Sequence, residues 1–362
     1  MPTWAAAQVD ALKQWIEYMR LVRVAIAGFG GVGRATANLL LTRRARYRRV
    51  HGVDLRLVAV CGSRSGLADA GGLEAHRLDG LQPGLSGPAF IEASGADIVI
   101  EAGPSDFRTG GPGLGYIQSA LSAGRDAIVI SKGALVHSGL ELRALAHSSG
   151  AIIKLSGAAA AALPTIDLIE HSLKGCEVLK IEGILNATTN YLLDAMMNQD
   201  VSFDEALARA QAGGFAEADP RNDTEGWDTA CKLILIANFG LGADLTMDDL
   251  IVEGIQSVTA HDVAAWRRQG VVPKLVGSLH CAEGDARATV GIRTYPPTDP
   301  LAHVSGKNKA IRITSDAMGE TIAIGSGTEP FATAAAALKD LEHILAAGAE
   351  RFAGTQEEEE WF

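Results

Sequence analysis

The first part of the chain alternates short apolar runs with longer segments of helical spacing. Continuous apolar runs of strand length predict strands buried on both faces, as in a parallel sheet. Five such runs, separated by helix-like segments, occupy residues 21–27, 54–61, 96–103, 126–133 and 151–156. Strands that alternate with helices predict an α/β fold with a doubly wound parallel sheet over residues 21–155.

A different pattern follows this sheet. A strand-like run and a Thr-Thr-Asn turn lead into a helix within 177–198, and residues 249–272 have helical spacing with glycine breaks. Strand-like runs then recur between 272 and 324. They predict a second, mixed or antiparallel sheet in an α+β substrate domain over residues 156–324.

The two ends of the chain have patterns of their own. Residues 1–20 are spaced as a short amphipathic helix and predict an N-terminal helical extension. An alanine-rich helix within 325–350 is expected to pack back on the first domain. Residues 351–362 contain a run of four glutamates and predict a solvated acidic tail.

The first apolar run ends in a glycine motif. Gly28, Gly30 and Gly33 form G-x-G-x-x-G between a predicted strand and a predicted helix, the context that this motif requires. Such glycines allow a tight turn and let backbone N–H groups at a helix N-terminus approach a pyrophosphate. The motif therefore predicts a Rossmann-type dinucleotide site.

The end of the second strand bears on which dinucleotide binds. A fold that prefers NAD usually offers an acidic side chain to the ribose hydroxyls here, and this chain instead has Ser63 and Arg64 after Cys61. A guanidinium beside a hydroxyl suits a 2′-phosphate, which favours NADP, with NAD as the alternative. The other interpretation of Arg64 is a solvated loop residue.

The stretch 213–235 concentrates carboxylates beside one lysine. Asp228 and Lys232 are four residues apart on a predicted helix, with Glu217, Asp219 and Asp223 in the turn-rich loop before it. An ordinary pair at this spacing is a surface ion pair of a few tenths of a kcal/mol. Here the helix continues as an apolar run, and a charge buried there needs a partner. Trp227 and the apolar residues after it predict a largely buried helix.

Two further loops are candidates for binding. Lys132 follows the C-terminal end of a predicted strand, where ligands collect in such sheets, although a lone loop lysine is often only solvated. Gly157 and the five alanines that follow it predict either a tightly packed turn or backbone carbonyls exposed to a ligand or cation. The sequence alone leaves both interpretations open.

The composition of the chain limits the classes of partner that it can be expected to bind. The formal charge of −11 argues against nucleic acid or an anionic membrane surface as the main partner, because both reward a basic face. The four cysteines are far apart in the chain and indicate neither a zinc site nor a disulfide framework. A reducing cytoplasm is therefore the expected location. No apolar run is long enough to span a bilayer.

Taken together, these stretches resemble homoserine dehydrogenase. The resemblance rests on GFGGVG (28–33), SKGALV (131–136), GILNATTNYLL (183–193), the acidic stretch (213–233) and DPLAHVSGKNKAIRITSDAMGE (299–320). It implies NAD(P)-dependent, reversible reduction of L-aspartate 4-semialdehyde to L-homoserine. It also implies a homodimer formed through the second domain, with neither an aspartate kinase nor a C-terminal regulatory module.

The resemblance also implies roles for individual residues. Lys232 would be the proton donor and Lys132 a second ammonium near substrate and nicotinamide. Glu217 and the catalytic Asp228 would hold the amino group and hydroxyl of the substrate, with Asp223 in support. The implied substrate-binding residues are Lys132, Gly214, Glu217, Asp223 and Asp228. The implied cofactor-binding residues are Gly28, Phe29, Gly30, Gly31, Val32, Gly33, Arg64, Gly103, Lys132 and Gly327. A monovalent cation such as Na⁺ would bind the backbone carbonyls of Ser156, Ala159, Ala161 and Leu163.

Some positions depart from the family pattern. Ser131 stands where the family usually has Asn, Ala187 where it has Gly, and Phe215 where it has Tyr. These changes around the expected pocket leave an alternative open, a dehydrogenase of the same fold that acts on another amino-acid-like aldehyde or alcohol. A non-catalytic NADP-binding protein is the third hypothesis.

Overall fold

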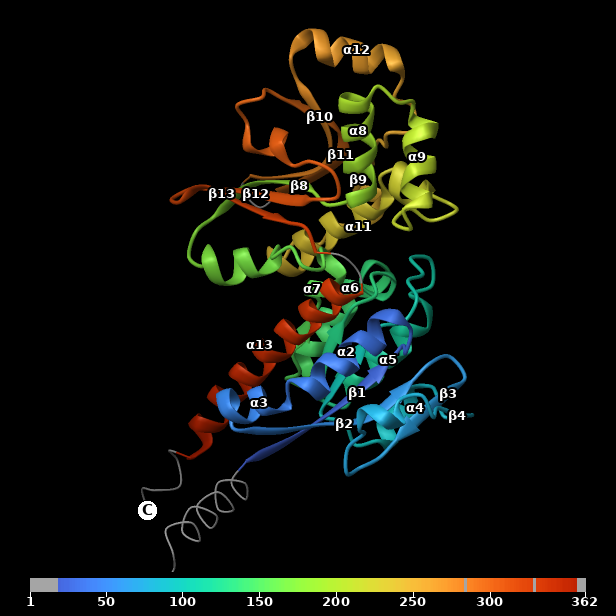
Figure 1. Ribbon diagram of the computed structural model, residues 1–362. Helices are drawn as coiled ribbons and strands as arrows, with labels where there is room; N and C mark the ends of the chain where they lie inside the picture. The colour runs from blue at the N-terminus through green and yellow to red at the C-terminus, as the bar shows by residue number, and fades with distance from the viewer. Residues whose placement is uncertain (1–18, 283–284, 328–329, 357–362) are drawn as a thin grey trace, which may run out of the picture.

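The computed structural model describes residues 19–282, 285–327 and 330–356 and contains two sheets (Figure 1). The first sheet has the order β4-β3-β2-β1-β5-β6-β7. Its parallel strands are β1 (Arg20–Ala27), β2 (Val53–Cys61), β5 (Ile98–Glu101), β6 (Asp126–Val129) and β7 (Ile153–Lys154). The short β3 (Ser65–Ala68) and β4 (Gln82–Pro83) add an antiparallel edge.

Alternate side chains of β1 pack on opposite faces of this sheet. Val24 and Ile26 join one buried cluster, and Ala25 and Ala27 join another on the other face, as the two-residue period of a strand requires. The covering helices are α2 (Gly31–Thr42), α3 (Arg44–His51), α4 (Pro88–Ala93), α5 (Gly111–Ser122) and α6 (Gly133–Ser149). Both faces are covered, which confirms the predicted doubly wound α/β sheet.

The second sheet is mixed and has the order β13-β12-β8-β10-β11-β9. Its strands are β8 (Val178–Ile184), β9 (Leu250–Val252), β10 (Val272–Ala282), β11 (Asp285–Tyr295), β12 (Lys309–Ser315) and β13 (Gly319–Gly325). The helices of this part are α7 (Ser156–Ala159), α8 (Ala187–Gln199), α9 (Phe203–Ala212), α10 (Arg221–Thr224), α11 (Trp227–Leu235) and α12 (Ala260–Gln269). The predicted second sheet is confirmed.

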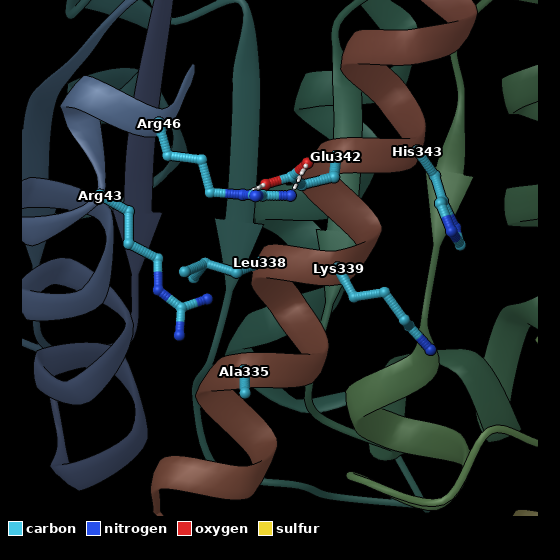
Figure 2. Close-up of a pocket in the computed structure, with 7 residues that line it drawn as sticks. All are labelled: Arg43, Arg46, Ala335, Leu338, Lys339, Glu342 and His343. Carbon is cyan, nitrogen blue, oxygen red and sulfur yellow. Dashed lines mark hydrogen bonds and ion pairs between the residues drawn. The ribbon is translucent and has the colours of Figure 1, made fainter. Parts of the chain in front are cut away.

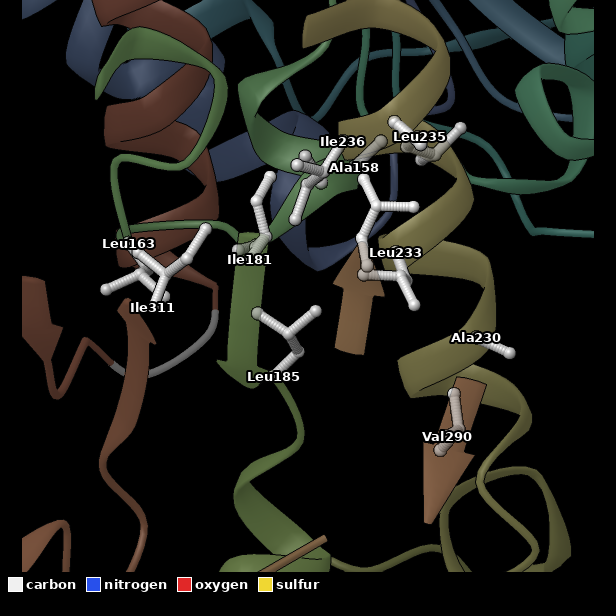
Figure 3. Close-up of a cluster of buried hydrophobic side chains, with 14 of the residues drawn as sticks. Ala158, Leu163, Ile181, Leu185, Ala230, Leu233, Leu235, Ile236, Val290 and Ile311 are labelled. Carbon is white, nitrogen blue, oxygen red and sulfur yellow. The ribbon is translucent and has the colours of Figure 1, made fainter. Parts of the chain in front are cut away.

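Helix α11 packs closely on β10 because a glycine leaves room for it. A Cβ on Gly277 would lie 3.2 Å from the Thr229 side chain and 3.5 Å from that of Leu233. Figure 3 shows Leu233 of α11, and Ile236 directly after this helix, in the core that they share with Ile181 of β8 and with Leu185. The helix that carries the candidate lysine is therefore held against the second sheet along its length.

After β13 the chain crosses to the first sheet through α13 (Phe331–Gln356), which lies beside α2 (Figure 1). Leu338, Leu341 and Ile344 of α13 share a buried cluster with Val24 and Ile26 of β1. The helix runs beyond residue 350 to Gln356, so part of the predicted tail is helical. The predicted N-terminal extension lies outside the described residues up to residue 18, as does the end of the tail from 357.

Two local predictions were wrong. Trp227 was expected inside the helix core, but it opens α11 and is 41% exposed, because Gly226 in a left-handed conformation starts the helix just before it. The helical segment expected at 249–272 instead begins with β9, paired in parallel with β11, before α12. In the described part of the chain, no helix is both long and apolar enough to cross a bilayer.

Five short turns of helix complete the fold. They are η1 (Ala75–Arg77), η2 (Leu168–Ser172), η3 (Ile236–Gly240), η4 (Met247–Asp249) and η5 (Pro300–His303). Turn η3 prolongs α11, and η2 lies on the segment that connects α7 to β8. This connection between the two sheets places η2 near the C-terminal helix α13.

Candidate active site

The two parts of the chain meet at one buried carboxylate. Lys132 follows β6 and caps the N-terminus of α6, and its Nζ lies 2.6 Å from Oδ1 of Asp228 on α11. Lys232, one turn further along α11, places its Nζ 2.5 Å from Oδ2 of the same carboxylate. Two ammonium groups from different parts of the fold thus share one acid.

Burial distinguishes this set from a surface ion pair. The Asp228 side chain is 5% exposed, that of Lys232 13% and that of Lys132 23%. Burial by itself would raise the pKa of the Asp228 carboxyl, but the positive charges of Lys132 and Lys232 outweigh it and hold that pKa well below its usual range. Asp228 is therefore a permanent anion that compensates one of the two ammonium charges.

The amine of Lys232 is directed inward. Besides Asp228, its Nζ donates to the backbone carbonyl of Leu185 at 2.8 Å, at the end of the segment that links β8 to α8. The ammonium therefore has acceptors on two sides and its remaining hydrogen available to a ligand, since an ammonium has three donors. The Lys232 amine therefore points neither into bulk solvent nor into an apolar core.

Asn186 organises the acids around the lysines and was not recognised in the sequence. Its Nδ2 donates to Asp223 and to Asp228, both at 2.8 Å, while its Oδ1 caps α8 by accepting from the Thr189 N–H. Burial first, and then the negative charge of Asp228, raise the pKa of the Asp223 carboxyl. An Asn before a helix was a sequence signal for the cap, but its contacts with the two acids are tertiary.

The other predicted substrate residues lie at the surface. Glu217 is exposed, and within the described chain its carboxylate makes no hydrogen bond or ion pair. Gly214 is exposed with φ +71°, a left-handed conformation that suits glycine. Asp219 is held in an exposed ion pair with Arg221. The structure thus brings Lys132, Lys232, Asp223 and Asp228 together, and leaves Glu217 and Gly214 outside this contact set.

An open cleft of about 570 Å³ lies between the two domains. One wall is the loop at 105–108 after β5, and the other is formed by the acidic loop and the start of α11. The cleft reaches Ser105, whose hydroxyl accepts from the Lys132 N–H at 3.0 Å, and Cys231, the neighbour of Lys232. The cleft therefore borders the segments that carry Lys132 and Lys232, although neither lysine lines it.

The glycine turn has the shape that a dinucleotide requires. A Cβ on Gly28, which has φ +101°, would meet the Ala102 backbone at 2.3 Å, and a Cβ on Gly33 would meet the Gly28 carbonyl at 2.0 Å. Gly30 and Gly31 instead face open space, at the N-terminus of α2 where no side chain caps the helix. The two packed glycines hold the turn, and the two open ones leave room for a pyrophosphate beside backbone N–H groups.

The remaining residues of the motif support this turn. Phe29 is buried beneath the guanidinium of Arg34, which lies 4.7 Å from the ring centroid, and Val32 is half-buried in the first turn of α2. Ser63 and Arg64 are exposed just after β2. Since the Gly28 N–H donates to the Cys61 carbonyl at 2.8 Å, they follow the strand end adjacent to the glycine turn.

A buried glutamate beside this turn was missed in the sequence. Glu101 is 1% exposed at the end of β5 and accepts from the Ser131 hydroxyl at 2.6 Å and the Gly103 N–H at 2.7 Å. Burial raises the pKa of the Glu101 carboxyl. A charged residue inside an apolar strand run was the available signal, because such a residue needs partners. Through Gly103 and Ser131, Glu101 ties the β5 loop to the loop that carries Lys132.

The alanine loop already has one cationic neighbour. Buried Lys309 donates from Nζ to the Ala160 carbonyl at 3.0 Å, and Ala161 has φ +56°. Gly327 packs against this loop, because a Cβ there would lie 2.7 Å from those of Ala162 and Ala332. Ser156 is bound through its N–H and hydroxyl to Asp340 of α13, whose pKa burial raises to about 6.

Comparison with known proteins gives a consistent result. A family model described as homoserine dehydrogenase matches residues 164–341, and one for the NAD binding domain of homoserine dehydrogenase matches residues 28–156. An NAD(+)-dependent homoserine dehydrogenase of Pseudomonas canavaninivorans is 34% identical, over 89% of this chain and 96% of its own. A homoserine dehydrogenase of Methanocaldococcus jannaschii is 30% identical, over 89% and 98%.

The fold leads to the same family. The crystal structure of a homoserine dehydrogenase from Thiobacillus denitrificans superposes with a TM-score of 0.82 at 27% identity, covering 92% of this chain and 75% of that one. These matches span both sheets and include the glycine turn and both lysines. The chain belongs to the homoserine dehydrogenase family, which comprises NAD(P)-dependent oxidoreductases that act on a CH–OH group.

Proposed function

We propose that this protein interconverts L-homoserine and L-aspartate 4-semialdehyde, with Lys232 and Lys132 at the reacting oxygen. The observation that carries the proposal is the carboxylate of Asp228 held between two lysines where the two domains meet. A dehydrogenase that reduces an aldehyde needs a cation where the alkoxide forms, and a proton to give it. The two lysines around Asp228 can supply both.

The chemistry follows from the charges. When bound, NAD(P)H would supply the hydride that reduces the aldehyde carbon and would be oxidised to NAD(P)⁺. Lys232 stabilises the developing oxyanion and donates a proton to it, and Lys132 adds a second positive charge on the cofactor side. Asp228 orients both amines and offsets part of the cost of holding them close together. In the direction of oxidation, Lys232 in its neutral amine form accepts the hydroxyl proton and becomes the ammonium.

The substrate ammonium has a separate partner. Asp228 is already surrounded by Lys132, Lys232 and Asn186. We therefore assign the ammonium of homoserine to Asp223, with Glu217 joining from the acidic loop when the substrate is bound. The raised pKa of Asp223 agrees with this role, because a cationic ligand would restore the charged form of its carboxyl.

The direct test is turnover. Purified protein is expected to oxidise NADPH with aspartate semialdehyde and to reduce NADP⁺ with homoserine. A preference in kcat/KM for longer or carboxylate-bearing alcohols would favour the alternative substrate class that Ala187 and Phe215 leave open. Calorimetric binding of cofactor without turnover of any of these substrates would contradict the proposed function and favour a binding protein.

We also propose NADP as the preferred cofactor because of Arg64, although one relative is described as NAD(+)-dependent. Replacing Arg64 with Asp is expected to lower the NADPH to NADH ratio of kcat/KM about tenfold, which corresponds to ~1.4 kcal/mol. Steady-state assays with both cofactors measure this ratio. Arg49→Asp on α3, another exposed arginine, is the control. An unchanged ratio in the Arg64 variant would show that this side chain does not contact the 2′-phosphate.

We propose a homodimer formed along the β13 edge of the second sheet. Ile324 and Met318, 55% and 59% exposed, and Leu179 make this end of the sheet apolar. Ile324→Lys is expected to convert dimer to monomer in light scattering at micromolar concentration, because it places a charge in the interface. The matched control is Ile251→Lys on β9, the opposite edge of the same sheet. If only Ile251→Lys dissociates the dimer, the interface lies along β9 instead.

The alanine loop is proposed to bind a monovalent cation only weakly, because the Lys309 ammonium lies against it. Exchanging choline chloride for NaCl at equal ionic strength is expected to leave the wild-type Tm within about 1 °C. Lys309→Met removes the ammonium, and the same exchange should then raise Tm by several degrees, since an ion that binds only the folded state stabilises it. If NaCl raises the Tm of the wild type by several degrees but not that of Lys309→Met, the lysine does not compete with the cation.

A further inference from the structure

The structure contains a second cluster of polar side chains that shares no residue with the proposed active site. Asp167 immediately precedes turn η2, His171 lies four residues later within it, and His343 approaches them from α13. One ligand atom from each residue lies within 4.8 Å of the other two. We propose that these three side chains bind a divalent first-row transition-metal ion, such as Zn²⁺, Co²⁺ or Ni²⁺, which links η2 to α13.

The distances leave room for an ion rather than a hydrogen bond. Nδ1 of His343 and Oδ1 of Asp167 are 3.8 Å apart, and within the described chain this nitrogen is buried without a hydrogen-bond partner. Zinc bonds of about 2.0–2.2 Å place two tetrahedral ligands about 3.4 Å from each other. A small shift of either side chain would therefore allow both to bind one ion.

The two imidazoles are arranged to act together. Their ring centroids are 4.9 Å apart in an edge-to-face contact. Burial lowers the pKa of His343; the negative charge of Asp167 opposes this shift, and Lys154, His171 and Lys339 add to it. The His171 side chain is 55% exposed, so water can complete the coordination. Two imidazoles and one carboxylate favour d-block ions over Ca²⁺ or Mg²⁺.

Two neighbouring lysines carry positive charges that would weaken metal binding, and this effect can be tested. Lys339, one turn before His343 on α13, forms an ion pair with Oδ2 of Asp167, and Lys154 pairs with Glu170 at 2.6 Å. Figure 2 shows Lys339 and His343 leaving the same side of α13, while Glu342 turns to Arg46. Lys339 competes with a metal for the carboxylate, so Lys339→Met is expected to tighten binding about tenfold.

The experiment uses the full-length, tag-free protein after EDTA treatment and dialysis. Titration with Zn²⁺ by calorimetry, and with Co²⁺ by visible absorption, is expected to show one ion per chain. Excess Zn²⁺ should raise Tm by several degrees, because the ion binds only the folded state. His343→Ala and His171→Ala should each weaken binding at least tenfold. His261→Ala, at an exposed histidine of α12, is the control and should bind as the wild type does.

Two results would overturn the proposal. The first is an absence of Zn²⁺ and Co²⁺ binding by the wild type. The second is binding that survives both histidine substitutions, which would indicate a cysteine or another surface site. Circular dichroism shows whether each alanine variant folds. If either does not, the Zn²⁺ affinity of Lys339→Met tests the proposal, and an affinity equal to that of the wild type contradicts it. None of these readouts depends on dehydrogenase activity.

Discussion

Replacing Lys232 with Met is expected to lower kcat in both directions by about 10²–10⁴-fold, the usual contribution of a positioned general acid. The methionine keeps most of the side-chain volume beside Asp228 and Leu185 but removes the proton and the positive charge. Binding of cofactor alone should change little, because the glycine turn lies on the other domain. Stopped-flow assays with homoserine and NADP⁺ measure the loss directly.

The control for this variant is Lys174→Met, which removes an exposed lysine before β8 and should leave kcat unchanged. The folding of the Lys232 variant is checked by Tm and by cofactor titration. Undiminished turnover after Lys232→Met would contradict the assignment of this residue. An increase in KM with kcat preserved would mean that Lys232 binds substrate without donating the proton.

Replacing Asp228 with Asn is expected to damage both stability and activity. The substitution keeps the shape of the side chain, but it leaves Lys132 and Lys232 close together without their shared counter-charge. Removing one partner of a buried ion pair costs on the order of 3 kcal/mol, which lowers Tm by roughly 4 °C in a chain of this size. Differential scanning calorimetry at pH 7 measures this loss, and kcat/KM should fall with it.

The pH dependence of this effect has a definite sign. The folded state lowers the pKa of Asp228, so its contribution is fully present above the ordinary aspartate pKa of about 3.9. That contribution is lost as the pH falls below this value towards the lowered pKa of the folded state. The difference in stability between wild type and Asp228→Asn should therefore be constant from pH 5 to pH 7 and shrink only in strong acid.

Asp200→Asn is the matched control for this substitution. Asp200 pairs with Arg267 at 2.8 Å at the surface, so its loss should change Tm by no more than about 1–2 °C. Asp200 also has φ +56°, which Asn tolerates. If Asp228→Asn were as stable as this control and remained active, the shared carboxylate would not be needed to hold the two lysines.

Much of the fold was predictable because its signals are local. Continuous apolar runs predicted the parallel strands, and the glycine motif after β1 predicted the turn that the structure shows, with Gly28 and Gly33 packed against backbone. The errors arose where local preference competes with neighbours. Three residues of β9 carry too little pattern to distinguish a strand from a helix, and Trp227 is exposed because Gly226 starts the helix later than expected.

The site was predictable only in part. The spacing of Asp228 and Lys232 placed them on one helix face, but their contact with Lys132 depends on how two domains meet. Asn186 and Glu101 act through contacts with residues far away in the chain, 42 positions away for Asn186 and Asp228. Such contacts leave only an indirect signal in the sequence, a polar residue where an apolar or solvated one would be expected.

The most direct test of the central claim is a crystal structure with NADP⁺ and homoserine bound. The account predicts that Nζ of Lys232 lies within about 2.6–3.2 Å of the substrate hydroxyl oxygen. It also predicts that this hydroxyl faces C4 of the nicotinamide, with Asp223 near the substrate ammonium. A substrate bound with its hydroxyl beyond hydrogen-bond distance of both Lys232 and Lys132 would contradict the assignment of these amines to the reaction.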